Sequence, residues 1–97
     1  SEPLEELRTL YRALSLKEEL VSLLDLCLDA SGVKLFIGSE GGAASLEECS
    51  VIASPYHMHG EWVGALAVIG PTRIPYNRVI PLVRSTAHSL SNALSQR

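Results

Sequence analysis

Two arginines near the C-terminal end of the chain have the spacing of an anion-binding corner. Arg73 and Arg78 flank the point where a helix is expected to begin, and Thr72 and Tyr76 lie beside them. Backbone N–H groups at a helix N-terminus, together with guanidinium groups, bind phosphate or carboxylate. The structural alternative is that Arg73 only fixes the corner by pairing with a nearby carboxylate or carbonyl. These four residues are therefore candidate anion or interface contacts.

The histidines and cysteines lack the spacing of a metal site. His57, His59, His88 and Cys49 match no zinc-ligand pattern, so surface histidines are the simpler interpretation. Cys27 falls on an apolar helical face, which is typical of a small core residue. We expect neither a metal nor a cofactor.

No group of residues predicts catalysis. Glu47 and Glu48 are adjacent acids in an expected loop, which is typical of solvated charge. The sequence contains no nucleophile triad, no phosphate-binding loop and no dinucleotide-binding motif. We therefore expect that the chain is not an enzyme.

The candidate corner depends on the elements on either side of it. Residues 64–69 form a short apolar run of small and β-branched residues, which predicts a buried strand. Gly70 and Pro71 end this strand, and Pro75 suits the start of a helix over 75–96. Pro81 lies inside that helix and predicts a kink or a separate first turn.

Three strands are expected in total. Residues 33–37 are rich in β-branched and aromatic side chains, and two further strands cover 49–58 and 61–69. His59 and Gly60 between the last two predict a hairpin with a tight primed turn.

This hairpin turn predicts a register between the two strands. It places Tyr56 opposite Val63 and Ser54 opposite Ala65. Pro55 removes one ladder hydrogen bond, so its strand is expected at a sheet edge or with a bulge at that point.

The first thirty residues predict two helices. Residues 3–14 carry leucines at helical spacing. The run Ser15-Leu-Lys-Glu18 then has the form of a capping box, which begins a second helix that ends near Ala30. One bent helix is the alternative. The predicted fold is α+β, with two helices before a small, mainly antiparallel three-stranded sheet and one helix after it, a layout that would suit a GAF- or PAS-like module.

Composition limits the function further. The chain has 97 residues, enough for one domain or a fragment, and no initiator Met, which suggests a fragment. With 8 Lys or Arg against 11 Asp or Glu, the net charge is −3, whereas nucleic-acid modules are usually basic. The two cysteines fit a reduced cytosolic setting, and no apolar run approaches the roughly 18 residues of a membrane span.

Three segments carry a resemblance to a known family. Residues 70–83, Gly-Pro-Thr-Arg-Ile-Pro-Tyr-Asn-Arg-Val-Ile-Pro-Leu-Val, resemble the C-terminal signature of HrcA-type heat-inducible transcription repressors of bacteria. Phe36-Ile-Gly-Ser-Glu40 and Cys49-Ser-Val-Ile-Ala53 are similar to two further pieces of that pattern, in the same order. Ile74 stands where the family often has Met, which is a volume-conserving difference.

The resemblance implies a fold and a role. HrcA-type repressors join a winged-helix DNA-binding domain to a GAF-like domain that is interrupted by an inserted dimerisation domain. They bind an inverted-repeat operator upstream of chaperone genes, and the chaperonin GroEL helps to keep them active. Residues 1–97 look like the C-terminal part of the GAF-like domain, without the winged helix that reads DNA. The implied role is regulation and assembly of a cytoplasmic repressor, with no membrane partner.

The partners of this part follow from the same resemblance. The rest of the repressor and a second copy are the expected contacts, because an incomplete sheet with an open edge favours self-association. We therefore expect a homodimer or a swapped pair. A small-molecule-sensing GAF-like domain, or a purely structural part without a ligand, remain open as alternatives at this point.

Overall fold

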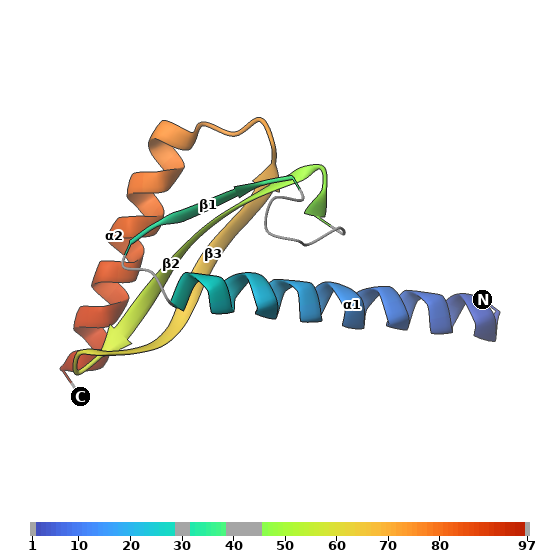
Figure 1. Cartoon of the computed structure of the whole chain (residues 1–97), viewed down its shortest axis with the longest axis horizontal. Helices are drawn as coiled ribbons and strands as arrows, with labels where there is room; N and C mark the ends of the chain where they lie inside the picture. Colours follow the sequence, from blue (N-terminus) through green and yellow to red (C-terminus); the bar gives the residue numbers. More distant parts are fainter. Residues whose placement is uncertain (1, 29–31, 39–45, 97) are drawn as a thin grey trace.

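The computed structural model describes residues 2–28, 32–38 and 46–96. In these residues a three-stranded antiparallel sheet, in the order β1-β2-β3, lies between two helices (Figure 1). The elements along the chain are α1 (Pro3–Leu28), β1 (Lys34–Ile37), β2 (Cys49–Met58), β3 (Glu61–Pro71) and α2 (Tyr76–Ser95). The predicted α+β class with an antiparallel sheet is confirmed, and the arrangement is consistent with part of a GAF-like domain.

The N-terminal segment is one continuous helix. α1 has 26 residues and runs through Ser15 without interruption, so the predicted boundary at Ser15 is wrong. The capping-box pattern was misleading because the apolar residues change sides near this point. With about 100° of rotation per residue, the apolar residues before Ser15 and those after it lie on nearly opposite sides of the helix. The first set is Leu4, Leu7, Tyr11 and Leu14; the second is Leu16, Leu20, Leu23 and Cys27.

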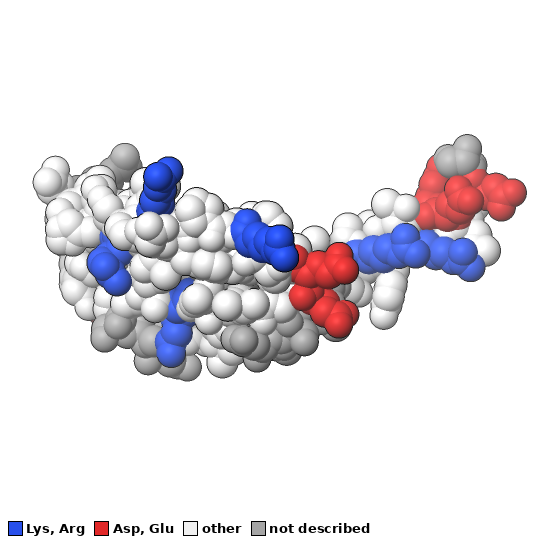
Figure 2. Space-filling model, turned by 90° about the horizontal axis from the view of Figure 1, so that it is seen from above, with Lys and Arg blue, Asp and Glu red and all other residues white. Residues whose placement is uncertain are grey.

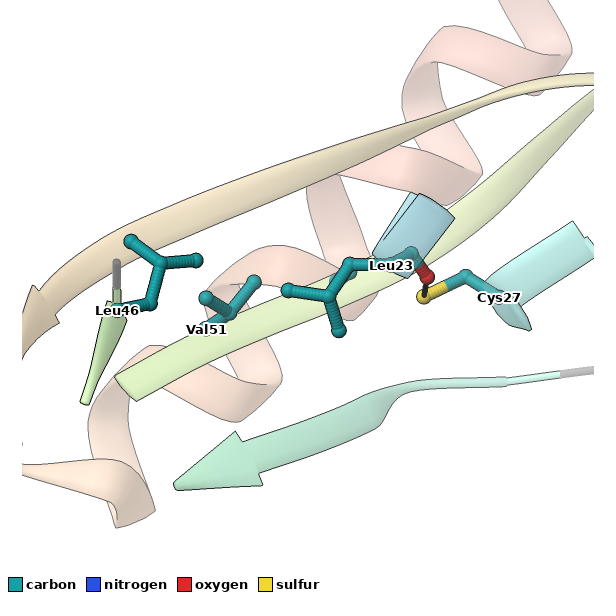
Figure 3. Close-up of a cluster of buried hydrophobic side chains, with 5 residues drawn as sticks. Leu23, Cys27, Leu46 and Val51 are labelled. Atoms are coloured by element: carbon teal, nitrogen blue, oxygen red, sulfur yellow. Dashed lines mark hydrogen bonds between the residues drawn. The ribbon is translucent and has the colours of Figure 1, made fainter. Parts of the chain in front are cut away.

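The second half of α1 packs on one face of the sheet. Leu23 and Cys27 of α1 form a buried cluster with Val51 and Ala53 of β2 and with Leu46 (Figure 3). Leu23 is 2% exposed, and the Cys27 thiol donates a hydrogen bond to the Leu23 carbonyl oxygen at 3.5 Å. The packing of this cluster fixes the C-terminal half of α1 against the central strand.

The opposite face of the sheet packs against α2. Side chains alternate along a strand, so Ile52 points away from the face that carries Val51 and Ala53. Ile52 has no exposed surface. The buried residues of α2 are Val83, Ala87 and Ser91. The sheet is thus the middle of three layers.

Two serines connect α2 to the end of the hairpin. The Ser91 hydroxyl accepts a hydrogen bond from the His57 N–H at 2.9 Å, and the Ser95 hydroxyl accepts one from the His59 N–H at 3.1 Å. These bonds satisfy backbone donors of the β2 end and the turn, where the sheet ladder does not continue. They fix the tip of the hairpin on the last turns of α2.

The predicted hairpin is confirmed, but its register changes beyond the turn. His59 and Gly60 both have positive φ, 51° and 83°, as a primed turn requires. A bulge between Tyr56 and His57 then adds one residue to β3. Tyr56 therefore lies opposite Gly64 instead of Val63.

The same shift moves the next pairs. Ser54 lies opposite Leu66, so the predicted pairing with Ala65 is wrong. Pro55 belongs to the central strand, not to an edge strand. However, β1 reaches only as far as Ala53, so Pro55 has a neighbouring strand on one side alone, and the bulge follows directly. The missing N–H of Pro55 is accommodated there.

The C-terminal helix has nearly the predicted limits. α2 begins at Tyr76, directly after Pro75, and ends at Ser95. It runs without interruption through Pro81, so the first turn is not separate from the rest. Pro81 is the sixth residue of α2 and lies past the first turn, so it removes one intrahelical hydrogen bond from a helix that nevertheless continues.

Candidate assembly surface

The first half of α1 extends beyond the sheet. Figure 1 shows that its N-terminal end lies far from the sheet and from α2. Every residue from Glu2 to Leu14 is exposed, and the first partly buried positions are Ser15 and Leu16. Leu16 is also the first residue of the chain to pack against the buried cluster. The projecting half therefore has no apolar cover among the described residues.

This projecting half carries a continuous apolar surface, which we call the outer stripe. Its exposed fractions range from 51% for Leu14 to 73% for Tyr11. The residues of the outer stripe are Leu4, Leu7, Leu10, Tyr11 and Leu14. Single exposed apolar residues are common on proteins, whereas a contiguous patch indicates an interaction surface. The outer stripe is the strongest candidate for such a surface in the described part of the chain.

Charges are segregated along the same helix. Figure 2 shows carboxylates at the free end of α1 and basic side chains next to them. In sequence order these are Glu2, Glu5 and Glu6, then Arg8, Arg12 and Lys17, then Glu18 and Glu19. Any surface that covers the outer stripe therefore lies beside charges that change from acidic to basic and back along α1.

The free edge of β3 is a second exposed surface. β3 pairs with β2 on one side, and no described strand lies on its other side. Several of its apolar side chains are well exposed, with fractions of 37–48%. They are Trp62, Val63, Val68 and Ile69. An open edge with apolar side chains favours the addition of another strand.

The predicted anion corner is only partly assembled. The Tyr76 hydroxyl donates a hydrogen bond to the Thr72 carbonyl oxygen, which brings these two residues together. Thr72, Arg73 and Arg78 are exposed, while Tyr76 is half-buried. The corner is thus braced by this hydrogen bond, and Arg73 and Arg78 are exposed beside it.

Local carbonyls use most of the N–H groups at this corner. The Tyr76 N–H donates to the Ile74 carbonyl, and the N–H groups of Arg78 and Val79 donate to the Pro75 carbonyl, at 2.9–3.0 Å. The helix start therefore offers few free donors to an anion. Anion or interface contacts by Arg73 and Arg78 stay a prediction.

The three histidines do not gather around one point, although His57 and His88 line the same hollow. His57 lies with its ring against Trp62 in an edge-to-face geometry, at 5.3 Å between ring centroids. His88 lies 3.3 Å from the Asn92 amide on the exposed side of α2, and His59 is in the hairpin turn. In the described residues there is no group of three side chains that could hold a metal ion. Nor do the described helices include one that is long and apolar enough to cross a membrane.

Cys27 gives a pH-dependent prediction. Burial raises the pKa of the Cys27 thiol above its usual value of 9.0, and Lys34 opposes this shift in part. The unfolded thiol ionises first, so this contribution to stability is complete below about pH 9 and is lost as pH rises through the folded pKa. We expect the free energy of unfolding to fall more steeply between pH 8 and 10.5 for the natural chain than for Cys27→Ala. Equal slopes in denaturant unfolding would contradict this.

The outer stripe is not recognisable as a free surface from the sequence. The apolar spacing of residues 3–14 predicts an ordinary helix face, with no sign that this face points away from the sheet. The available signal is the change in the side of the helix that carries apolar residues near Ser15, a pattern that also predicts a helix boundary. The bonds from Ser91 and Ser95 to the hairpin were also missed, since helical serines carry no such signal.

Comparisons with known proteins place this module in a larger context. The family model described as "HrcA protein C terminal domain" matches residues 1–80. The heat-inducible transcription repressor HrcA of Chromobacterium violaceum is 50% identical over 97 residues, which cover 100% of this chain and 28% of that protein. HrcA of Methylobacillus flagellatus is 51% identical over 89 residues, or 92% of this chain and 26% of that protein.

A solved structure supports the fold. The crystal structure of a hypothetical protein is similar with a TM-score of 0.71 and 22% sequence identity, over 98% of this chain and 28% of that chain. The class defined by these findings is an α+β module found within longer proteins. The chain belongs to the HrcA family, in the part described as the C-terminal domain. It spans about a quarter of the length of the curated relatives.

Proposed function

We propose that this chain is the C-terminal regulatory and assembly part of a heat-inducible transcription repressor of chaperone genes. The names of the curated relatives support this function. The net charge of −3 is unfavourable for direct contact with DNA. The operator is then read outside these residues, by the winged-helix domain that the family resemblance implies. The site of action is the cytoplasm, and the role is not enzymatic.

The observation that carries the assembly role is the exposed apolar surface of α1. Apolar side chains with exposed fractions of up to 73% are unfavourable in water. Another protein surface is therefore expected to cover them in the full-length protein. The open edge of β3 is a second site for such contacts. The proposed partners are the remaining domains of the repressor, a second copy and, as the resemblance implies, the chaperonin GroEL.

The test compares three proteins for operator binding and for oligomeric state. These are the full-length repressor, a form truncated before Ser1, and residues 1–97 alone. Loss of dimerisation and of operator affinity together in the truncated form, with no DNA binding by residues 1–97, is the expected result. Specific operator binding by residues 1–97 would contradict the proposal. Arg73, Arg78 and Arg84 would then be the first residues to substitute.

The small-molecule-sensing alternative receives no support from the hollows of the described residues. Those of about 420–480 Å³ lie on the exposed surface of α1 and are not enclosed. A hollow lined by His57, Trp62, Arg84 and His88, among others, has a volume of about 170 Å³. Sites for small-molecule effectors usually have roughly 300–1,000 Å³. This hollow is too small for such an effector.

A further inference from the structure

We propose that the hollow between α2 and the end of the hairpin binds one oxyanion group, a phosphate or a carboxylate, with Arg84 as its charged ligand. This inference is independent of the assembly role and concerns a different face of the molecule. Three observations carry it. They are the place of the hollow in the fold, the hydrogen-bond donors in its wall that have no acceptor among the described residues, and a positive charge that has no ion pair among them.

The hollow lies where the end of the hairpin meets α2 (Figure 1). From α2 it is lined by Arg84, His88 and Ser91, which are four and three residues apart and so share one face of the helix. From the hairpin it is lined by His57 and Trp62. The hydrogen bond from the His57 N–H to the Ser91 hydroxyl oxygen, at 2.9 Å, already joins the two elements. The wall of the hollow is therefore held in place before any ligand enters.

Ser91 contributes a donor that is not used. Its side chain is 2% exposed, and its oxygen accepts the bond from His57. A hydroxyl also donates one hydrogen bond, and the proton of Ser91 has no acceptor among the described residues. Because a buried donor without an acceptor is unfavourable, a ligand oxygen in the hollow would stabilise this group.

His57 contributes a second donor. Its Nδ1 is buried and has no hydrogen-bond partner in the described part of the chain. A proton on Nδ1 would be an orphaned buried donor, so we assign the proton of the neutral ring to Nε2. The edge-to-face contact with Trp62, at 5.3 Å between ring centroids, limits rotation of the imidazole. The ring thus offers one N–H group in a restricted orientation.

Arg84 supplies the positive charge. Its side chain is exposed, lines the hollow and forms no ion pair with a described residue. His88 follows one turn later on the same face, and the Asn92 amide lies 3.3 Å from its Nε2. Among the described lining residues there is no Asp or Glu. A wall with a guanidinium group, N–H and O–H donors and no described carboxylate favours an anion over a cation.

The volume limits the size of the ligand. The hollow has about 170 Å³, which is below the usual range for organic effectors. It is sufficient for one phosphate ion or for the carboxylate end of an acidic side chain. Trp62 adds an apolar wall against which the methylene group of such a side chain can pack. The ligand chemistry is therefore an oxyanion, and its source is either free phosphate or an Asp or Glu of another segment of the repressor.

The first test measures phosphate binding to the full-length repressor by isothermal titration calorimetry at constant ionic strength. Arg84→Gln removes the charge but keeps a long polar side chain, and we expect it to raise the dissociation constant roughly tenfold or more, as for loss of a hydrogen bond to a charged group. Arg84→Lys keeps the charge without the planar fork and is expected to lie between the two. Arg12→Gln is the matched control, because it removes the same charge from the projecting half of α1, far from α2 (Figure 1). It is expected to leave the affinity unchanged.

Three outcomes would overturn the site. The first is an equal phosphate affinity of the natural protein and Arg84→Gln. The second is a loss of affinity with Arg78→Gln alone, because this would place the anion at the corner before α2. The third is that neither phosphate nor acetate binds at millimolar concentrations.

The second test locates the anion and identifies its source by NMR of the full-length repressor with isotope-labelled tryptophan. Trp62→Phe assigns the indole signal of Trp62. Phosphate is expected to shift this signal in the natural protein and not in Arg84→Gln, whereas binding without a shift would place the anion elsewhere and overturn the proposal. Acetate serves as the probe for an acidic side chain. A larger response to phosphate supports free phosphate as the source, and a larger response to acetate supports a carboxylate.

Discussion

Replacement of Leu23 by alanine is expected to lower the free energy of unfolding by about 2–5 kcal/mol. Leu23 is 2% exposed and is the largest side chain that α1 contributes to the buried cluster. The substitution removes buried methyl groups and leaves a cavity between α1 and Val51 of β2, while the helix propensity of alanine is as good as that of leucine. Denaturant unfolding followed by circular dichroism measures the change.

Leu26→Ala is the matched control for this prediction. The same atoms are removed from the same helix, three residues further along, but Leu26 is 51% exposed. We expect a change within about 0.5 kcal/mol, as for most surface substitutions. Equal losses for the two variants would show that Leu26 is also buried in solution, and that α1 is covered on that side.

Replacement of Gly64 by alanine is expected to destabilise the hairpin by about 1–3 kcal/mol, the usual effect of overpacking. Gly64 lies opposite Tyr56, whose ring covers it. A Cβ at this position would lie 2.6 Å from Tyr56 Cζ, so the ring must move out of its half-buried place. The measurement is again the free energy of unfolding.

A double-mutant cycle separates this steric effect from a general cost of losing glycine. In a Tyr56→Ala background the obstructing ring is absent, and alanine is by itself better than glycine inside a strand by roughly 0.5–1 kcal/mol. The sign of the Gly64→Ala effect should therefore reverse to stabilising. If the substitution destabilises both backgrounds equally, the contact with Tyr56 is not the cause.

Much of the fold could be predicted because the signals for it are local. Alternating β-branched residues and the His59-Gly60 turn define the hairpin, and the proline and glycine residues before Tyr76 define the start of α2. The register beyond the turn could not be predicted, because a bulge is set by how side chains such as Tyr56 pack on a facing glycine. Its position follows from the assembled sheet and not from the turn alone.

The candidate surface was less predictable for a different reason. Helical spacing shows that an apolar stripe exists but not what covers it. In the sequence, a single helix whose apolar residues change from one side to the other has the same pattern as two helices. The continuity of α1 through Ser15 is therefore information that only the structure supplies. Thr72 and Arg73 are the opposite case. Their side-chain chemistry predicts an anion or interface contact, but no sequence signal identifies the partner.

The projecting half of α1 also has a thermodynamic consequence. A stretch of about twelve residues with no tertiary contacts has only a marginal helix–coil equilibrium in water. Its helicity is therefore linked to occupancy of the outer stripe, since whatever binds Leu7 and Tyr11 also shifts that equilibrium toward helix. On warming, we expect this segment to lose its helical structure before the core around Leu23 unfolds. The single helix α1 thus combines a thermally labile first half with a second half that is packed stably on the sheet.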